Sequence, residues 1–204
     1  MKIVISESQY NKILKEEEEQ KVLYIPSLKI FSGDWDLLQK FLKHRGNPPY
    51  SIGGNLNLVG LRVESLRSLV SVEKDLYAYD TPLESLGNLT SVGGLMDLSH
   101  TPLESLKNLT YVGGSLLLKH TPIKSLGNLQ YVGDYLDLEG TPIKSLGNLK
   151  SVGGYLDLRR TDIESLGNLK SVARNLDLRG TPLSKMYIKK QIREMVNVGG
   201  EIYF

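Results

Sequence analysis

Thr141-Pro-Ile-Lys-Ser-Leu-Gly-Asn-Leu-Lys-Ser-Val-Gly-Gly-Tyr-Leu-Asp-Leu-Arg-Arg160 is one copy of a unit of twenty residues that repeats without insertion or deletion over residues 52–181. One threonine in each copy marks the period, at Thr81, Thr101, Thr121, Thr141, Thr161 and Thr181. A short repeat of constant length is typical of a solenoid, in which each copy forms one turn and neighbouring turns cover its apolar side. The repeat therefore predicts a stack of equivalent turns around one continuous core.

The apolar residues of the unit occupy fixed columns. In the quoted copy and the next one they are Val152, Leu156, Leu158, Ile163, Leu166 and Leu169. Residues 155–159 alternate between polar and apolar side chains, which is the pattern of a strand with one buried face. Copies of this strand must pair in parallel. Twenty residues leave no room for a full helix in each turn, so we expect the opposite side to be extended or briefly 3₁₀.

These patterns predict an α/β repeat protein: a right-handed parallel-β solenoid of twenty-residue leucine-rich repeats, with about eight strands, little curvature and helical caps at both ends. Three segments follow one another along the chain. Residues 1–50 form an amino-terminal strand and helix segment with a capping helix, residues 51–183 form the solenoid, and residues 184–204 form a closing helix and the last strand.

Both ends carry helix patterns that can cover the core. At the amino end we expect a strand over residues 2–5, a helix that begins at Ser6, and a second helix that begins at Asp34 or Ser32. The apolar face of that second helix consists of Trp35, Leu38, Phe41 and Leu42. At the carboxyl end, residues 185–196 predict one helix, and residues 198–204 predict the eighth strand. The side chains expected to face the last turn are Ile188, Ile192, Met195 and Val196.

Short polar residues mark the bends of each turn. Proline follows most of the threonines and ends the strand there. Serine and asparagine recur at Ser85, Ser105, Ser125, Ser145 and Ser165, and at Asn88, Asn108, Asn128, Asn148 and Asn168. Such side chains can satisfy backbone groups that strand pairing misses, so we expect hydrogen-bonded ladders with a structural role.

Composition excludes several classes of function. The 204 residues are 40% hydrophobic and 24% charged, with a net charge of +2, which is too mild for a nucleic-acid or anionic-membrane partner. The absence of cysteine excludes disulfides and thiolate metal sites. The amino terminus shows no signal peptide and no stretch reaches membrane-spanning length, so we expect a cytoplasmic protein that is a monomer by default.

The pattern Asn-Leu-x-x-Val-Gly-Gly-x-Leu-x-Leu-x-x-Thr-x-Ile-x-Ser-Leu-Gly resembles leucine-rich repeats, and more closely the variant found in receptor L domains. The resemblance covers about two-thirds of the chain and implies protein recognition through the sheet face, without catalysis. Residues 1–10 and 192–204 resemble uncharacterised repeat proteins of tailed bacteriophages, which would place the protein in the host cytoplasm.

Outward positions of the predicted strand form columns of candidate contacts. Aromatic and apolar side chains on an exposed sheet favour partner binding, and here they are Tyr77, Tyr79, Leu95, Leu117, Tyr135 and Tyr155. The central column contributes Asp137, Asp157 and Asp177, and the strand exits contribute Arg159, Arg160 and Arg179. Packing between stacked tyrosines is the structural alternative.

The sequence gives less support to a catalytic or a metal-binding site. Stacked Asp137, Asp157 and Asp177 would have the spacing of a glycosidase pair, but they belong to the repeating unit and no enclosed pocket is indicated. His100 and His120 should be neighbours, yet surface histidines of this kind are more typical of solvated side chains than of zinc ligands. We expect no catalytic residue, no metal and no cofactor.

The sequence thus predicts a non-enzymatic protein–protein interaction module that presents one sheet face. Two alternatives remain open at this point: carbohydrate binding through the same tyrosines, and a structural role in an assembly such as that of a phage.

Overall fold

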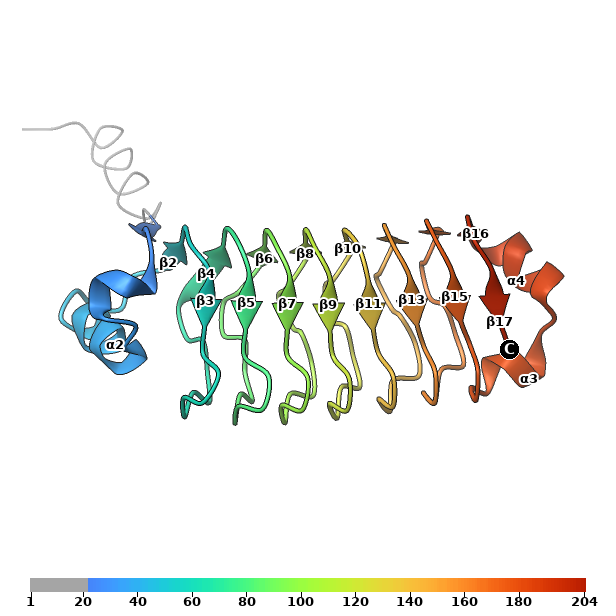
Figure 1. The fold of residues 1–204 in the computed structure, drawn as a ribbon, viewed down its shortest axis with the longest axis horizontal. Coiled ribbons are helices and arrows are strands. Elements are labelled where there is room, and N and C mark those ends of the chain that lie inside the picture. The colour runs from blue at the N-terminus through green and yellow to red at the C-terminus, as the bar shows by residue number, and fades with distance from the viewer. Residues whose placement is uncertain (1–21) are drawn as a thin grey trace, which may run out of the picture.

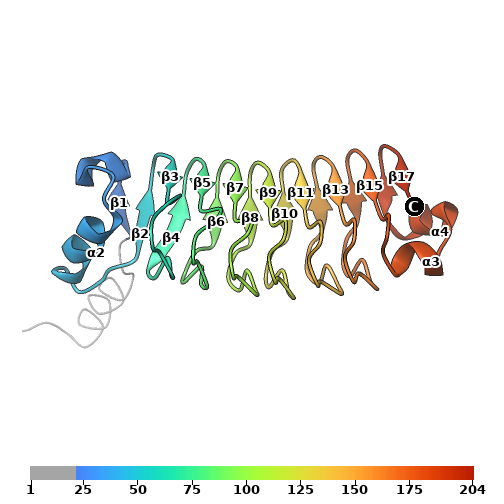
Figure 2. The ribbon, with the colours of Figure 1, turned by 60° about the horizontal axis from the view of Figure 1, so that its bottom comes forward.

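The computed structural model describes residues 22–204. The strand expected over residues 2–5 and the helix expected to begin at Ser6 lie outside the described residues. The described chain forms a parallel β-solenoid, and Figures 1 and 2 show a nearly straight stack with helices at its two ends. The predicted fold class and the low curvature are therefore confirmed.

Each turn contributes strands to two sheets. The first sheet has nine strands: β1 (Leu23–Ile25), β2 (Tyr50–Ile52), β4 (Leu69–Val72), β6 (Ser91–Val92), β8 (Tyr111–Val112), β10 (Tyr131–Val132), β12 (Ser151–Val152), β14 (Ser171–Val172) and β16 (Asn197–Val198). The second sheet has eight: β3 (Leu56–Asn57), β5 (Leu76–Tyr77), β7 (Met96–Asp97), β9 (Leu116–Leu117), β11 (Leu136–Asp137), β13 (Leu156–Asp157), β15 (Leu176–Asp177) and β17 (Ile202–Tyr203).

Parallel pairing sets residues of successive turns side by side. Val132 of β10 pairs with Val112 of β8 and Val152 of β12, and in the second sheet Asp157 pairs with Asp137 and Asp177. The second sheet is the one predicted from the alternating pattern, including its eighth strand. The first sheet was not predicted as strands, because the glycines that follow its valines in most turns interrupt any alternation of polar and apolar residues.

The core is one continuous apolar column inside the stack. Leucines of the repeat such as Leu136, Leu138 and Leu146 are fully buried, as are Val92, Val112 and Val132 of the first sheet. The third side of each turn is extended, with isolated parallel bridges such as Ser105 to Ser125. The expected extended opposite side is therefore confirmed, and the sheets cover the core on the remaining two sides.

Hydrogen bonds from short side chains hold the bends. The hydroxyl group of each repeat threonine is buried and donates to the carbonyl oxygen three residues before it, as in Thr141 to Leu138 at 2.8 Å. Serine hydroxyl groups accept the amide two residues later, as in Ser145 from Gly147 at 3.2 Å. The serines therefore satisfy backbone amides, as predicted, but each of these bonds lies within one turn, so the serines form a column of separate bonds and not a ladder that links the turns.

The two-glycine motif lies at the corner between the sheets. A Cβ atom at Gly113, the first glycine of Gly113-Gly114, would collide with the carbonyl oxygen of Gly93 in the preceding turn. The close approach of the two backbones at this corner therefore favours a residue without a side chain.

The amino-terminal cap consists of the 3₁₀ segment η1 (Leu28–Phe31) and the helix α2 (Trp35–Lys43). Asp34 is the N-cap of α2, since its carboxylate accepts the Leu37 amide at 3.0 Å. Leu38 and Leu42 are buried against the core, and so is Trp35. The predicted capping helix and its apolar face are thus present, with Asp34 rather than Ser32 at the start.

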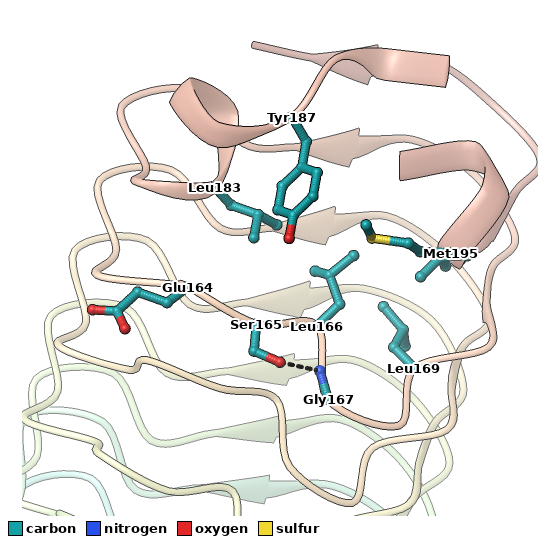
Figure 3. Close-up of a pocket in the computed structure, with 9 residues that line it drawn as sticks. Glu164, Ser165, Leu166, Gly167, Leu169, Leu183, Tyr187 and Met195 are labelled. Carbon is teal, nitrogen blue, oxygen red and sulfur yellow. Dashed lines mark hydrogen bonds between the residues drawn. The ribbon is translucent and has the colours of Figure 1, made fainter. Parts of the chain in front are cut away.

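The carboxyl-terminal cap differs from its prediction. Two short helices, α3 (Leu183–Met186) and α4 (Lys189–Met195), replace the single helix expected over residues 185–196, because Tyr187 and Ile188 are extended. Ile192 and Val196 are buried as expected, whereas Ile188 and Met195 are exposed. Figure 3 shows Leu166, Leu183 and Met195 around a shallow pocket between the last repeat and this cap.

Within residues 22–204, no helix combines the length and apolar content that crossing a bilayer requires.

Candidate binding face

The outer face of the second sheet carries the predicted contacts, and the structure divides them into two groups. In the amino-terminal half of this sheet, Tyr77, Leu95 and Leu117 are partly exposed and Tyr79 is exposed. We call these four residues the tyrosine end. Further along the stack, Tyr135 and Tyr155 are partly buried and belong to a network with the aspartates and arginines that follow.

Asp157 and Asp177 do not face solvent, which corrects their expected place among exposed contacts. The relative exposure of both residues is 0%, while Asp137 is partly exposed. The period of two correctly set all three on the outer face of the sheet, but larger side chains lie over Asp157 and Asp177. These two carboxylates are therefore not available for direct contact with a partner.

One oxygen of each aspartate supports its own backbone. Oδ1 accepts the amide two residues later, at 2.9 Å for Asp137, 3.0 Å for Asp157 and 3.1 Å for Asp177. This local bond turns the chain as it leaves the strand. It explains why aspartate recurs at this position, although the turns with Tyr77 and Leu117 there bend without this bond.

The other oxygen binds side chains from the same and the preceding turn. Oδ2 of Asp157 accepts Arg159 Nη2 at 2.6 Å and the Tyr135 hydroxyl group at 3.3 Å. Oδ2 of Asp177 likewise accepts the Tyr155 hydroxyl group at 2.8 Å and the Arg179 guanidinium. The tyrosine, aspartate and arginine side chains thus form an interlocked layer, in which charged hydrogen bonds are stronger than neutral ones.

The pKa values follow this arrangement. Burial would raise the pKa of Asp177, but hydrogen bonds from Arg179 and Tyr155 outweigh it and hold the pKa below its usual value. Burial raises the pKa of Asp137, and the neighbouring Asp157 carboxylate adds to the shift. Burial and the nearby carboxylates also raise the pKa of Tyr135 and Tyr155, so both hydroxyl groups stay protonated as donors.

Glu139 is the centre of the remaining ion pairs. It is buried, and its Oε2 lies 2.9 Å from Lys119 Nζ and 3.1 Å from Arg159 Nη2. Its carboxylate pKa is lowered, first by the hydrogen bond from Lys119. Carboxylate oxygens of Asp137, Glu139 and Asp157 lie within 4.8 Å of one another, a donor set that hard cations accept. Lys119 and Arg159 already supply the positive charge there.

Arginine side chains form the outermost layer of this region. The side-chain exposure is 79% for Arg160, 55% for Arg179 and 35% for Arg159, against 7% for Glu139. Arg159, Arg160, Arg179 and Gly180 line a shallow pocket, which we call the arginine pocket. Although acids and bases are equally numerous in this network, the groups that solvent reaches are mainly cationic.

A stacked tyrosine pair on the first sheet was not among the predicted contacts. The rings of Tyr111 and Tyr131 lie 5.4 Å apart and 11° from parallel, and both residues are exposed. The sequence did contain a signal for this pair, because tyrosine replaces the serine that other turns carry at the same position, such as Ser91 and Ser151. The predicted neighbours His100 and His120 do lie together, with ring centroids 5.2 Å apart.

Comparison of the chain with protein-family models, with curated proteins and with solved structures found no match.

Proposed function

We propose that the chain is a non-enzymatic protein-binding module that uses the outer face of the second sheet. One observation carries the proposal: the tyrosine end and the arginine pocket lie on the same face of one rigid parallel stack. Tyrosine and arginine are among the residue types that contribute most to binding when a partner covers them. The resemblance to leucine-rich repeats of receptor L domains supports the same use of the sheet.

Rigidity favours binding through this face. Every strand of the second sheet is paired in parallel with its neighbours, and the tyrosine, aspartate and arginine layer fixes side chains in advance. A partner therefore loses little affinity to the ordering of this surface. The aspartates that suggested catalysis are engaged by amides and arginines, which supports a binding role over an enzymatic one.

The test is partner capture by the full chain from cells that naturally contain it. Replacing both Tyr77 and Tyr79 by alanine should lower capture of a specific protein at least tenfold, with the melting temperature nearly unchanged. The matched control replaces Tyr111 and Tyr131, two exposed tyrosines of the first sheet. Equal losses in both double variants, or glycan binding on an array that needs Tyr135 and Tyr155, would contradict the proposal.

A further inference from the structure

The arginine pocket makes the exposed surface of the second sheet locally positive, although acidic and basic residues are equally numerous there. Asp157, Asp177 and Glu139 lie beneath, at 0%, 0% and 7% side-chain exposure, and the guanidinium groups lie above them. A partner that approaches this face therefore meets positive charge first. The buried carboxylates hold the arginines in place and neutralise part of their field, which limits it to short range.

Among the arginines of the pocket, Arg160 has the most N–H groups that are free to donate hydrogen bonds to a ligand. Within residues 22–204 its guanidinium makes no hydrogen bond of 3.5 Å or less, and its ion pair with Glu139 Oε1 is 3.6 Å long. Arg159 and Arg179, by contrast, bind aspartates through Nε and Nη2. A guanidinium has five N–H donors arranged as a fork that matches a carboxylate. Arg160 can thus bind such a ligand without breaking a hydrogen bond.

The neighbouring turns leave space around Arg160. The equivalent positions are Gly140 and Gly180, which have no side chains to fill the column beside it. Arg160 itself adopts a left-handed backbone with φ of 56°, as the two glycines do at 71° and 74°. An arginine in this conformation costs about 1 kcal/mol more than glycine, so stability alone favours glycine here.

We propose that the arginine pocket receives an acidic peptide segment of the protein partner, with Arg160 as its main carboxylate ligand. This inference rests on the proposed function, and it adds the chemistry of the partner. Charge complementarity supports it, because three guanidinium groups meet at one end of the face and bidentate arginine–carboxylate pairs are short and directional.

Peptide carboxylates fit the pocket better than nucleic acid does. The column of Arg159 and Arg179 begins with Val59, Tyr79, Ser99, Lys119 and Glu139, so no continuous basic stripe runs along the stack. A phosphate backbone needs positive charge over several nucleotides. The local cationic patch is instead the size of one or two carboxylate side chains.

The experiment measures fluorescence anisotropy of a labelled hexaglutamate peptide with the full chain at low ionic strength. The variant Arg160→Gly restores the residue found at both neighbouring turns and is expected to fold. It should weaken peptide binding about tenfold, and Arg160→Glu should weaken it further. Lys170→Gln, which removes the same charge from an exposed site outside the pocket, should leave binding within about twofold of the original chain.

Three results would overturn the inference. They are unchanged hexaglutamate binding in Arg160→Gly, an equal loss in Lys170→Gln, and tighter Arg160-dependent binding of a single-stranded oligonucleotide with the same number of charges. Partner capture that still depends on Tyr77 and Tyr79 would then leave the proposed function standing. A different result is also informative: Arg160→Gly could lose peptide binding while the Tyr77 and Tyr79 variant captures the partner normally. This would support the binding site at Arg160 and contradict the proposed use of the whole face.

Discussion

At the scale of single residues, the recurring threonine is explained by one hydrogen bond. Its hydroxyl group is buried in every repeat from Thr81 to Thr181 and donates to a carbonyl oxygen three residues earlier. The bond fixes the chain as it leaves the second sheet, whether proline follows, as at Thr141, or aspartate, as at Thr161. The threonine is therefore a structural requirement of each turn and not a candidate ligand.

Replacing Thr141 by valine tests this explanation. Valine keeps the shape of the side chain but removes the donor to the Leu138 carbonyl oxygen. We expect the free energy of unfolding to fall by about 1 kcal/mol, since the Thr141 amide still binds the same carbonyl at 3.1 Å. Urea denaturation followed by circular dichroism measures the change. Pro142→Ala, at an exposed position, is the control, and an equal or larger loss there would contradict the role given to the hydroxyl group.

Asp137 and Asp177 belong to one column, but their ionisation should affect the stability of the fold in opposite directions. The pKa of Asp137 is raised by burial, so the folded state holds its proton more tightly and ionisation lowers stability. Asp137→Asn keeps an oxygen for the Glu139 amide and should be more stable than the original chain at pH 7. That difference should vanish once the pH falls below the ordinary carboxyl pKa of 3.8, because Asp137 is then protonated in both states.

Asp177→Asn is the matched comparison. Despite burial, hydrogen bonds from Arg179 and Tyr155 hold the pKa of Asp177 below its ordinary value, so its carboxylate stabilises the fold above that value and loses the effect in acid. The variant should therefore be less stable than the original chain at pH 7 and should approach it in acid. Thermal melts from pH 7 to pH 3 measure both variants, and shifts of the same sign would contradict the explanation.

The aspartate column also shows what the sequence could and could not predict. Alternation with period two correctly predicted the strand and the outward direction of Asp157. Its burial depends on Tyr135, which reaches it from the preceding turn, and on Arg159, which folds back two residues. Periodicity describes the direction of each side chain separately. It carries no information on which long side chain will cover a short one.

At the scale of elements, helices were easier to predict where one face is strongly apolar. The spacing of Trp35, Leu38 and Leu42 predicts α2, and Asp34 marks its start. The carboxyl-terminal cap has weaker signals. The Gln191 side chain accepts the Ile188 amide at 3.0 Å and starts α4 there, which separates it from α3. A capping bond that begins a second helix inside an apparently continuous pattern is not visible from periodicity alone.

The capping role of α2 can be tested with two adjacent leucines. Leu38 is fully buried, whereas Leu37 is 46% exposed on the other side of the same helix. Leu38→Ala should lower the free energy of unfolding by about 2–5 kcal/mol, because it leaves a cavity at the end of the core. Leu37→Ala should change it by less than about 0.5 kcal/mol. Urea denaturation compares them, and similar values for the two variants would show that α2 does not cover the core.

At the scale of the whole molecule, stability accumulates along one dimension. Each turn contacts mainly the turns before and after it, and the two sheets continue without interruption from β2 to β16 and from β3 to β17. Stability in such a stack is close to a sum of turn and neighbour contributions. The number of turns also sets the distance between the tyrosine end and the arginine pocket. Adding a turn should therefore change this distance while the fold stays stable.

A duplicated turn separates the two properties. Inserting a second copy of residues 101–120 after His120 keeps every contact residue, repeats Leu117 once, and adds one strand to each sheet, because Thr101 and Thr121 occupy equivalent positions. The longer chain should be at least as stable in urea, with a larger m-value. Its tyrosine end and arginine pocket should move apart by about 4.8 Å. A partner that contacts both should bind at least tenfold more weakly, while hexaglutamate should bind as before. Unchanged partner affinity would mean that the partner uses only one end of the face.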